Sequence, residues 1–154
     1  MSRCAKINRA RFIPCGYDLP SIRGSAALEA QRVLIVEDCY LMTDAIQDIF
    51  TAAGATVVGA ANSVGSALRM IEALQIDIAC LDVNLGRENS FPLADELTSR
   101  FIPFVFVTGC SSNMLPPIHR AQPLVSKPLD PIELVHACQA AALRQGAGRV
   151  IAGK

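Results

Sequence analysis

The sequence has no tryptophan, no Cys-x-x-Cys pair and no uninterrupted apolar run of the length that crosses a membrane. A membrane helix needs about 18 or more apolar residues in a row, and closely spaced cysteines supply most structural zinc sites. The six cysteines are instead scattered, and the patterns around Cys80 and Cys138 predict buried thiols. We therefore expect no membrane span and no zinc site, and we expect a reduced, cytoplasmic setting.

The net charge is zero because a basic N-terminal part offsets an acidic remainder. Residues 1–32 hold six Lys or Arg against two Asp or Glu, whereas residues 33–154 hold eight against twelve. An acidic body is a poor match for the phosphate backbone of nucleic acid. The charge pattern therefore predicts no nucleic-acid partner.

Residues 1–30 show no sustained hydrophobic period, and Pro14, Gly16, Pro20 and Gly24 interrupt any regular element there. The stretch also lacks the continuous apolar core of a secretory signal. We interpret it as a flexible basic extension. A start site assigned too early would look the same, and a transit peptide or a nucleic-acid-binding arm are further alternatives.

From Val33 onward, short apolar runs alternate five times with amphipathic stretches. The central runs are apolar throughout, which is typical of parallel strands covered by helices on both faces. The pattern predicts an α/β domain over residues 31–146, with a doubly wound five-stranded parallel sheet, and a short tail at residues 147–154. The predicted strands are 33–36, 55–60, 76–82, 102–108 and 123–126. Four helices are predicted. The first covers residues 40–53 and is ended by Gly54, and the second is capped by Ser63, with Ala67, Leu68, Ile71 and Leu74 on one face. The third covers residues 90–100, with Ser90 as cap and Pro92 in its first turn, and the last runs from Asp130 to about Gln145 and is ended by Gly146.

The stretch between Thr108 and Lys127 contains Pro116, Pro117 and Pro123. Proline removes a backbone donor and breaks helices. A helix in this stretch is therefore expected to be short, irregular or partly 3₁₀. Loosely held elements supply the movement in molecular switches, and a static loop is the alternative interpretation.

Polar side chains gather where the predicted strands end. Glu37 and Asp38 follow the first strand, Asp82 ends the third, Thr108 ends the fourth, and Lys127 follows the fifth. A single acid at a strand end is usually a solvated loop residue, but the carboxyl ends of parallel strands meet at one edge of a sheet. Adjacent carboxylates repel, and a bound cation offsets the repulsion. Together these residues predict a functional site at that edge.

Four motifs, VLIVEDCY, CLDVNLG, FVFVTG and VSKPLD, occur in this order. In combination they resemble the receiver domain of bacterial response regulators, over residues 33 to about 145. The resemblance implies a flavodoxin-like sheet with strand order 2-1-3-4-5 and a role in two-component phosphorelay signalling. It also implies that Asp82 is the phosphoacceptor, that Thr108 is the switch hydroxyl, and that Lys127 pairs with the phosphoryl group.

The same resemblance implies a Mg²⁺ site formed by Glu37, Asp38 and Asp82, with the backbone carbonyl of Asn84 as a further ligand. Mg²⁺ prefers hard oxygen ligands and keeps several waters. Glu37 is one methylene longer than the aspartate often found there, and it can act through water. Asp82 is then a carboxylate nucleophile that forms an acyl phosphate, and Lys127 supplies a compact positive charge.

One expected aromatic residue is missing. Most receivers have an aromatic switch residue where this chain has Leu124. The segment DVNLGRENSFPLADEL resembles stand-alone receivers, common in alphaproteobacteria, whose fourth strand ends Phe-Ala-Thr-Gly. Here it ends Phe-Val-Thr-Gly at residues 106–109. That subgroup often has an aromatic shortly after Thr-Gly, but the residues that follow here are Cys110, Ser111 and Ser112. We therefore expect phosphorylation to be read out by the backbone of residues 110–122, together with the fifth strand and the last helix.

Four other reactive side chains are expected to have structural roles. Cys39 and Cys110 are interpreted as small residues tolerated at the rim of the site, with redox sensitivity as the alternative. His119 and His136 show no partner pattern, and His136 is expected on the surface of the last helix.

The expected function is a receiver that takes a phosphoryl group from a sensor histidine kinase or a phosphotransfer protein. It would act by contact with a downstream protein, or as a phosphate sink, and not as an enzyme beyond its own phosphorylation and dephosphorylation. A module of the same fold that binds without phosphate is the alternative. A haloacid-dehalogenase-type phosphatase needs a second Asp where the chain has Asn84. A flavodoxin-like electron carrier needs a Ser, Thr and Gly-rich loop where the chain has acidic EDCYLMTD.

Overall fold

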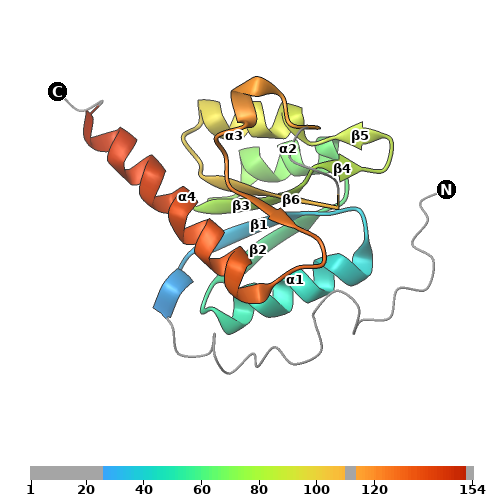
Figure 1. Cartoon of the computed structure of the whole chain (residues 1–154), viewed down its shortest axis with the longest axis horizontal. Coiled ribbons are helices and arrows are strands. Elements are labelled where there is room, and N and C mark those ends of the chain that lie inside the picture. Colours follow the sequence, from blue (N-terminus) through green and yellow to red (C-terminus); the bar gives the residue numbers. More distant parts are fainter. Residues whose placement is uncertain (1–25, 110–113, 152–154) are drawn as a thin grey trace.

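A five-stranded parallel sheet forms the centre of the computed structural model, which describes residues 26–109 and 114–151 (Figure 1). The strand order is β2-β1-β3-β6-β7, which confirms the predicted doubly wound, flavodoxin-like sheet. The strands are β1 (Arg32–Val36), β2 (Thr56–Ala61), β3 (Ile78–Asp82), β6 (Phe104–Thr108) and β7 (Leu124–Ser126).

Helices cover both faces of the sheet (Figure 1). On one face lie α1 (Tyr40–Ala52) and α4 (Pro131–Ile151), and on the other lie α2 (Val64–Ala73) and α3 (Phe91–Ser99). Among the described residues, no helix is both long enough and apolar enough to cross a bilayer.

The core has two halves because alternate residues of each central strand point to opposite faces. All members of both sets are buried, which explains why these strands read as continuously apolar. The residues facing α1 and α4 include Val33, Ile35, Ile78, Cys80, Val105 and Val107. The residues facing α2 and α3 include Leu34, Val36, Ala79, Leu81, Phe104 and Phe106.

The strand register lines up the carboxyl ends of the strands. The pairs nearest that edge are Val36 with Leu81, Asp82 with Val107, and Thr108 with Ser126. Because all five strands are parallel, residues that follow these pairs emerge at the same edge of the sheet.

Hydrogen bonds and backbone conformation at the helix ends explain two of the predicted helix boundaries. Ser63 and Ser66 form a reciprocal capping box that starts α2. Gly54 follows α1 with a φ of 86°, and its N–H donates to the Thr51 carbonyl, as glycine does in the turn that closes a helix. The predicted helix starting at Ser90 is present as α3, but the Ser90 side chain makes no capping hydrogen bond.

The predicted end of the last helix at Gly146 is wrong, since α4 continues to Ile151. Glycine inside a helix costs only about 1 kcal/mol relative to alanine. A side chain added at Gly146 would meet open space, so no tertiary contact interrupts the helix at this position.

The predicted extension also overlaps the folded core. A 3₁₀ turn, η3 (Ala26–Leu28), packs against α4, and Leu28 is only 1% exposed. The Leu28 N–H donates to the Ala53 carbonyl, and Gln139 donates to the Ala27 carbonyl. The domain therefore begins before residue 31, while residues 1–25 lie outside the described residues.

Two short elements lie near the edge that carries the predicted site. β4 (Asn84–Leu85) and β5 (Glu88–Asn89) form an antiparallel hairpin directly after β3, which the sequence pattern did not predict. The stretch before β7 contains one 3₁₀ turn, η5 (Pro117–His119). This confirms the expectation of a short 3₁₀ element there, while residues 110–113 lie outside the described residues.

Candidate functional site

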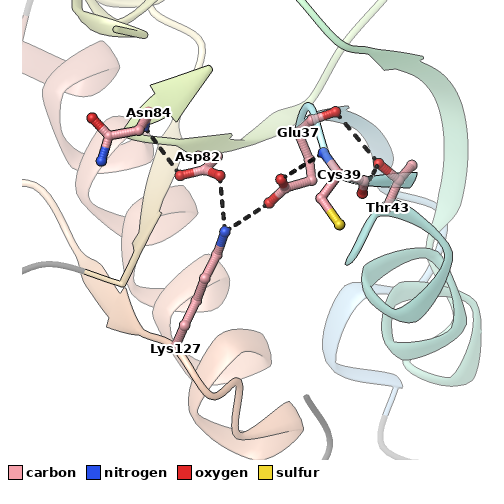
Figure 2. Close-up of polar contacts among 6 residues, drawn as sticks. All are labelled: Glu37, Cys39, Thr43, Asp82, Asn84 and Lys127. Atoms are coloured by element: carbon pink, nitrogen blue, oxygen red, sulfur yellow. Dashed lines mark hydrogen bonds and ion pairs between the residues drawn. The ribbon is translucent and has the colours of Figure 1, made fainter. Parts of the chain in front are cut away.

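Predicted site residues come together at the carboxyl edge of the sheet, and Figure 2 shows four of them: Glu37, Asp82, Asn84 and Lys127. Glu37 and Asp38 follow β1, Asp82 ends β3, and Lys127 follows β7. Carboxylate oxygens of Glu37, Asp38 and Asp82 all lie within 4.8 Å of one another. The sequence-based prediction of a cluster of acids is thus matched by the structure.

Burial makes this cluster unusual. Glu37 is 2% exposed and Asp82 is 6% exposed, whereas Asp38 is half-buried. A buried carboxylate loses the hydration that stabilises its charge, so it needs a cation or hydrogen-bond donors nearby. Each buried acid at this edge has both.

Lys127 provides the cation. Its Nζ lies 3.0 Å from Glu37 Oε2 and 2.8 Å from Asp82 Oδ2, and it points between the two acids (Figure 2). The Lys127 backbone N–H donates to the Thr108 carbonyl at 2.8 Å, which anchors the residue to the end of β6. Lys127 therefore links β1, β3 and β6 at one point.

Backbone donors hold the other carboxylate oxygens. The Cys39 N–H donates to Glu37 Oε1 at 3.0 Å, and the Asn84 N–H donates to Asp82 Oδ1 at 3.1 Å (Figure 2). Thr43 on α1 steadies the turn, since its hydroxyl lies 3.3 Å from the Cys39 carbonyl. The sequence does not reveal this role of the two N–H groups, because residue identities do not show where a backbone donor points.

The electrostatics show an excess of negative charge. Burial raises the pKa of Glu37 from 4.5 to about 7; Lys127 opposes the rise, and the nearby charge of Asp82 adds to it. Burial alone would lower the pKa of Lys127, but the two carboxylates raise it above its usual value. One lysine therefore holds its own proton firmly without fully compensating the acids around it.

The donor set fits a hard divalent cation. Three carboxylates converge, they offer oxygen ligands of the kind that Mg²⁺ prefers, and a dication would relieve the repulsion that one lysine leaves. A cavity of about 410 Å³ lies beside Glu37 and Asp38 and reaches Tyr40 and Asn62, which gives water and ions access to the acids. The residues that would hold the ion are Glu37, Asp38 and Asp82.

The remaining predicted residues are also close to this edge. Thr108 ends β6 and is 2% exposed. Asn84 is exposed at the start of β4, and its N–H is already committed to Asp82. Its backbone carbonyl as a metal ligand stays a prediction. Cys39 is half-buried beside the acids, and Cys110 lies outside the described residues.

His119 has partners that its sequence context did not reveal. The side chain is 3% exposed, and its Nε2 lies 2.9 Å from Asp95 Oδ1 on α3. The sequence shows no partner pattern for His119 because the partner is 24 residues away and is brought close only by packing. His136 is exposed on α4, as predicted.

Comparisons with known proteins point to one family. The family model described as the response regulator receiver domain matches residues 33–139. The solution structure of SdrG from Sphingomonas melonis Fr1 is 39% identical with a TM-score of 0.66, over 76% of this chain and 98% of that chain. The response regulator PhyR from Brucella abortus is 26% identical with a TM-score of 0.72, over 88% of this chain and 57% of that one.

A more distant likeness concerns the fold alone. A CheY-like receiver domain protein from Methanospirillum hungatei JF-1 is 23% identical with a TM-score of 0.67, over 78% of this chain and 99% of that chain. A comparison with curated proteins gave no match. Since the family model spans well over half of the chain and its motifs converge at one sheet edge, the chain belongs to the response regulator receiver domain family.

Proposed function

We propose that the protein accepts a phosphoryl group on Asp82 in a Mg²⁺-dependent reaction and passes the signal on by protein–protein contact. The observation that carries the proposal is the arrangement of Lys127, whose Nζ lies 2.8 Å from Asp82 Oδ2 and 3.0 Å from Glu37 Oε2. This places a positive charge beside the carboxylate that would become phosphorylated.

Each residue has a defined task in the transfer. A carboxylate oxygen of Asp82 forms the new bond to phosphorus while the bond between phosphorus and the donor breaks, and the donor leaves with that electron pair. Lys127 then pairs with the phosphoryl oxygens, since Asp82 loses its own charge in the acyl phosphate. Thr108 donates its hydroxyl hydrogen to a phosphoryl oxygen.

The metal site belongs to the same proposal. Glu37, Asp38 and Asp82 would hold Mg²⁺, with the backbone carbonyl of Asn84 as a further ligand. When bound, the ion neutralises charge on the acids and on the incoming phosphoryl group. Glu37 and Asp38 thus serve to recruit positive charge to Asp82 rather than to react themselves.

The phosphoryl donor would be a sensor histidine kinase or a phosphotransfer protein, in a cytoplasmic two-component system. The output would be contact with a downstream protein, and storage of phosphoryl groups as a sink is the alternative outcome. The near-neutral total charge and the acidic domain give no support to a nucleic-acid partner.

The test uses the full-length protein with acetyl phosphate and Mg²⁺, followed by intact mass. The wild type should gain about 80 Da, the mass of one phosphoryl group on a carboxylate. Asp82→Asn should show no gain, and Asp48→Asn, an exposed acid on α1, should behave as the wild type. A chelator should abolish the gain. Labelling that persists in Asp82→Asn would place the phosphoacceptor elsewhere and refute the proposal.

A further inference from the structure

His119 on η5 is one of two buried side chains in its segment. Between residues 114 and 122, Met114 and Ile118 are 61% and 77% exposed, whereas Leu115 and His119 are 4% and 3% exposed. Two side chains therefore anchor this segment in the core, and one of them carries an imidazole. Figure 1 shows η5 as the orange turn beside α3.

The His119 ring is held by three phenylalanines and one acid. It is stacked on Phe91 at a centroid distance of 6.2 Å and makes edge contacts with Phe104 at 6.3 Å and Phe106 at 5.9 Å. Asp95, which accepts or shares the hydrogen of Nε2 at 2.9 Å, is itself 65% exposed. The buried ring loses its hydration and gains apolar contacts and one hydrogen bond at the edge of the solvent. The net free energy that keeps it buried is therefore small.

The hydrogen bonds around η5 are mostly local. The His119 N–H donates to the Pro116 carbonyl, and the Gln122 N–H donates to the His119 carbonyl. Arg144 on α4 also holds the segment, since its Nη1 donates to the Ala121 carbonyl at 2.6 Å. Releasing the His119 ring from its pocket would leave the local bonds of the turn intact. A turn that keeps its local bonds when its buried ring is withdrawn can change its anchoring without unfolding, which is what a switch element needs.

The ring is also connected to the proposed phosphorylation site. Phe106 and Thr108 point to the same face of β6, because they are two residues apart on one strand. Leu124 pairs with Phe106 and packs on the same half of the core, and it offers no ring that could change position. His119 therefore supplies the aromatic ring that contacts this face from the loop before β7.

We propose that His119 is a conformational latch: its ring, seated against Phe91, Phe104 and Phe106 and bonded to Asp95, holds residues 114–122 closed, and phosphorylation of Asp82 releases it. The latch rests on the proposed phosphoacceptor function. Movement of Thr108 toward the phosphoryl group shifts the end of β6 and disturbs the face on which the ring sits. The released segment then presents His119 and Leu115 together with Met114 and Ile118.

The chain offers an internal control for the test, because His119 and His136 are its two histidines. Full-length protein is treated with diethyl pyrocarbonate, with and without beryllofluoride and Mg²⁺, and the modification of each histidine is followed by peptide mass. Exposed His136 should react at the same rate in both states. His119 should react at least about tenfold faster with beryllofluoride, a size common for coupling between two sites.

Two variants sharpen the result. Asp95→Ala removes the polar partner from an exposed position and leaves the aromatic pocket intact, so His119 should react faster even without beryllofluoride. Asp82→Asn should show no beryllofluoride effect. Equal protection of His119 in both states of the wild type, or an unchanged rate in Asp95→Ala, overturns the latch.

The phosphorylation assay separates the two proposals. If the wild type gains a phosphoryl group with acetyl phosphate while His119 stays protected, the latch alone is wrong. If Asp82 takes no phosphoryl group and His119 stays protected, both proposals fail.

Discussion

The region formed by α3 and η5 differs from the start of α2 and from the end of α1. α2 begins with a capping box at Ser63, whereas the Ser90 hydroxyl at the start of α3 is fully buried without a hydrogen-bond partner. α1 is followed by Gly54 in the left-handed region, whereas α3 is followed there by Phe101, with a φ of 57°. Next to α3 lies the buried imidazole of His119.

The start of α3 and the turn after it thus hold two locally unfavourable choices beside the buried His119, whereas the other left-handed non-glycine residue among those described is Ala30, with a φ of 61°. Locally unfavourable choices persist where the surroundings hold them in place, and they concentrate at functional or moving parts. The α1 and α4 face is an ordinary apolar core whose buried thiols are inert: burial raises the pKa of Cys138 to about 12 and that of Cys80 well above its usual value. We infer that the α1 face is the fixed part of the domain and that the α3–η5 region is the adjustable part.

The largest expected effect compares one core residue from each region. Phe50→Ala on α1 should cost about 3–5 kcal/mol of unfolding free energy, because a rigid core leaves a cavity. Leu115→Ala should cost about 2 kcal/mol, the low end for such a change, because the segment that carries it can close the space. Urea unfolding measures both, and equal costs would remove the distinction between the regions.

Glu37 at the site is a buried polar group of a different kind from Ser90 and His119, because it is a carboxylate that can be charged. Its raised pKa means that the folded state binds more protons than the unfolded state between pH 4.5 and about 7. Stability without Mg²⁺ should therefore fall as pH rises through that window, by about 1–3 kcal/mol, and level off above it. Unfolding at pH 5 and pH 8 in a chelator tests this.

Glu37→Gln removes the titrating group and should flatten the pH dependence, and Asp48→Asn should leave it as in the wild type. A wild-type stability that rises from pH 5 to pH 8 would show that Lys127 dominates the charge balance instead.

The two helix-starting serines should respond in opposite directions. Ser63→Ala removes the capping box and should cost about 1 kcal/mol. Ser90→Ala removes a buried hydroxyl that lacks a partner, and it should be neutral or stabilise by up to about 1 kcal/mol. Thermal unfolding of both variants would decide, and a loss in Ser90→Ala comparable to that in Ser63→Ala would reveal a hidden partner of Ser90.

The smallest expected effects lie at the helix ends. Gly54→Ala should destabilise by about 1 kcal/mol, because the added side chain makes ordinary contacts but disfavours the left-handed backbone. Phe101→Gly should change stability by less than about 1 kcal/mol, since the relief of the strained backbone is offset by the added chain entropy of glycine. A clear loss in Phe101→Gly would mean that the 63% exposed ring is held by contacts that stabilise the fold.

The sequence was most informative where the signal is local. Strand and helix periods predicted a doubly wound five-stranded parallel sheet, and the acids at strand ends predicted the cluster, because each signal lies within a few residues of its element. The order of the strands came from the family resemblance instead. The 3₁₀ character of η5 followed from closely spaced prolines in the same way.

The misses have one physical cause, which is packing between distant segments. Leu28 is a single leucine among residues without a period, and only its contact with α1 and α4 buries it. His119 is held in its buried position by Asp95 and by aromatic rings on α3 and β6, which are distant in the sequence. The continuation of α4 past Gly146 was missed because a glycine in a helix is tolerated when nothing else stops the helix.

The contacts of Lys127 with Asp82 and Glu37 have a consequence for the unfolded chain. Lys127 meets Asp82 across 45 residues and Glu37 across 90 residues of sequence, so the three side chains meet only when β1, β3 and the end of β7 are all in place. Such long-range closure comes late in the formation of a parallel sheet. If Asp82 accepts the phosphoryl group as proposed, a nascent or misfolded chain does not become phosphorylated. Phosphorylation of Asp82 therefore reports that folding is complete.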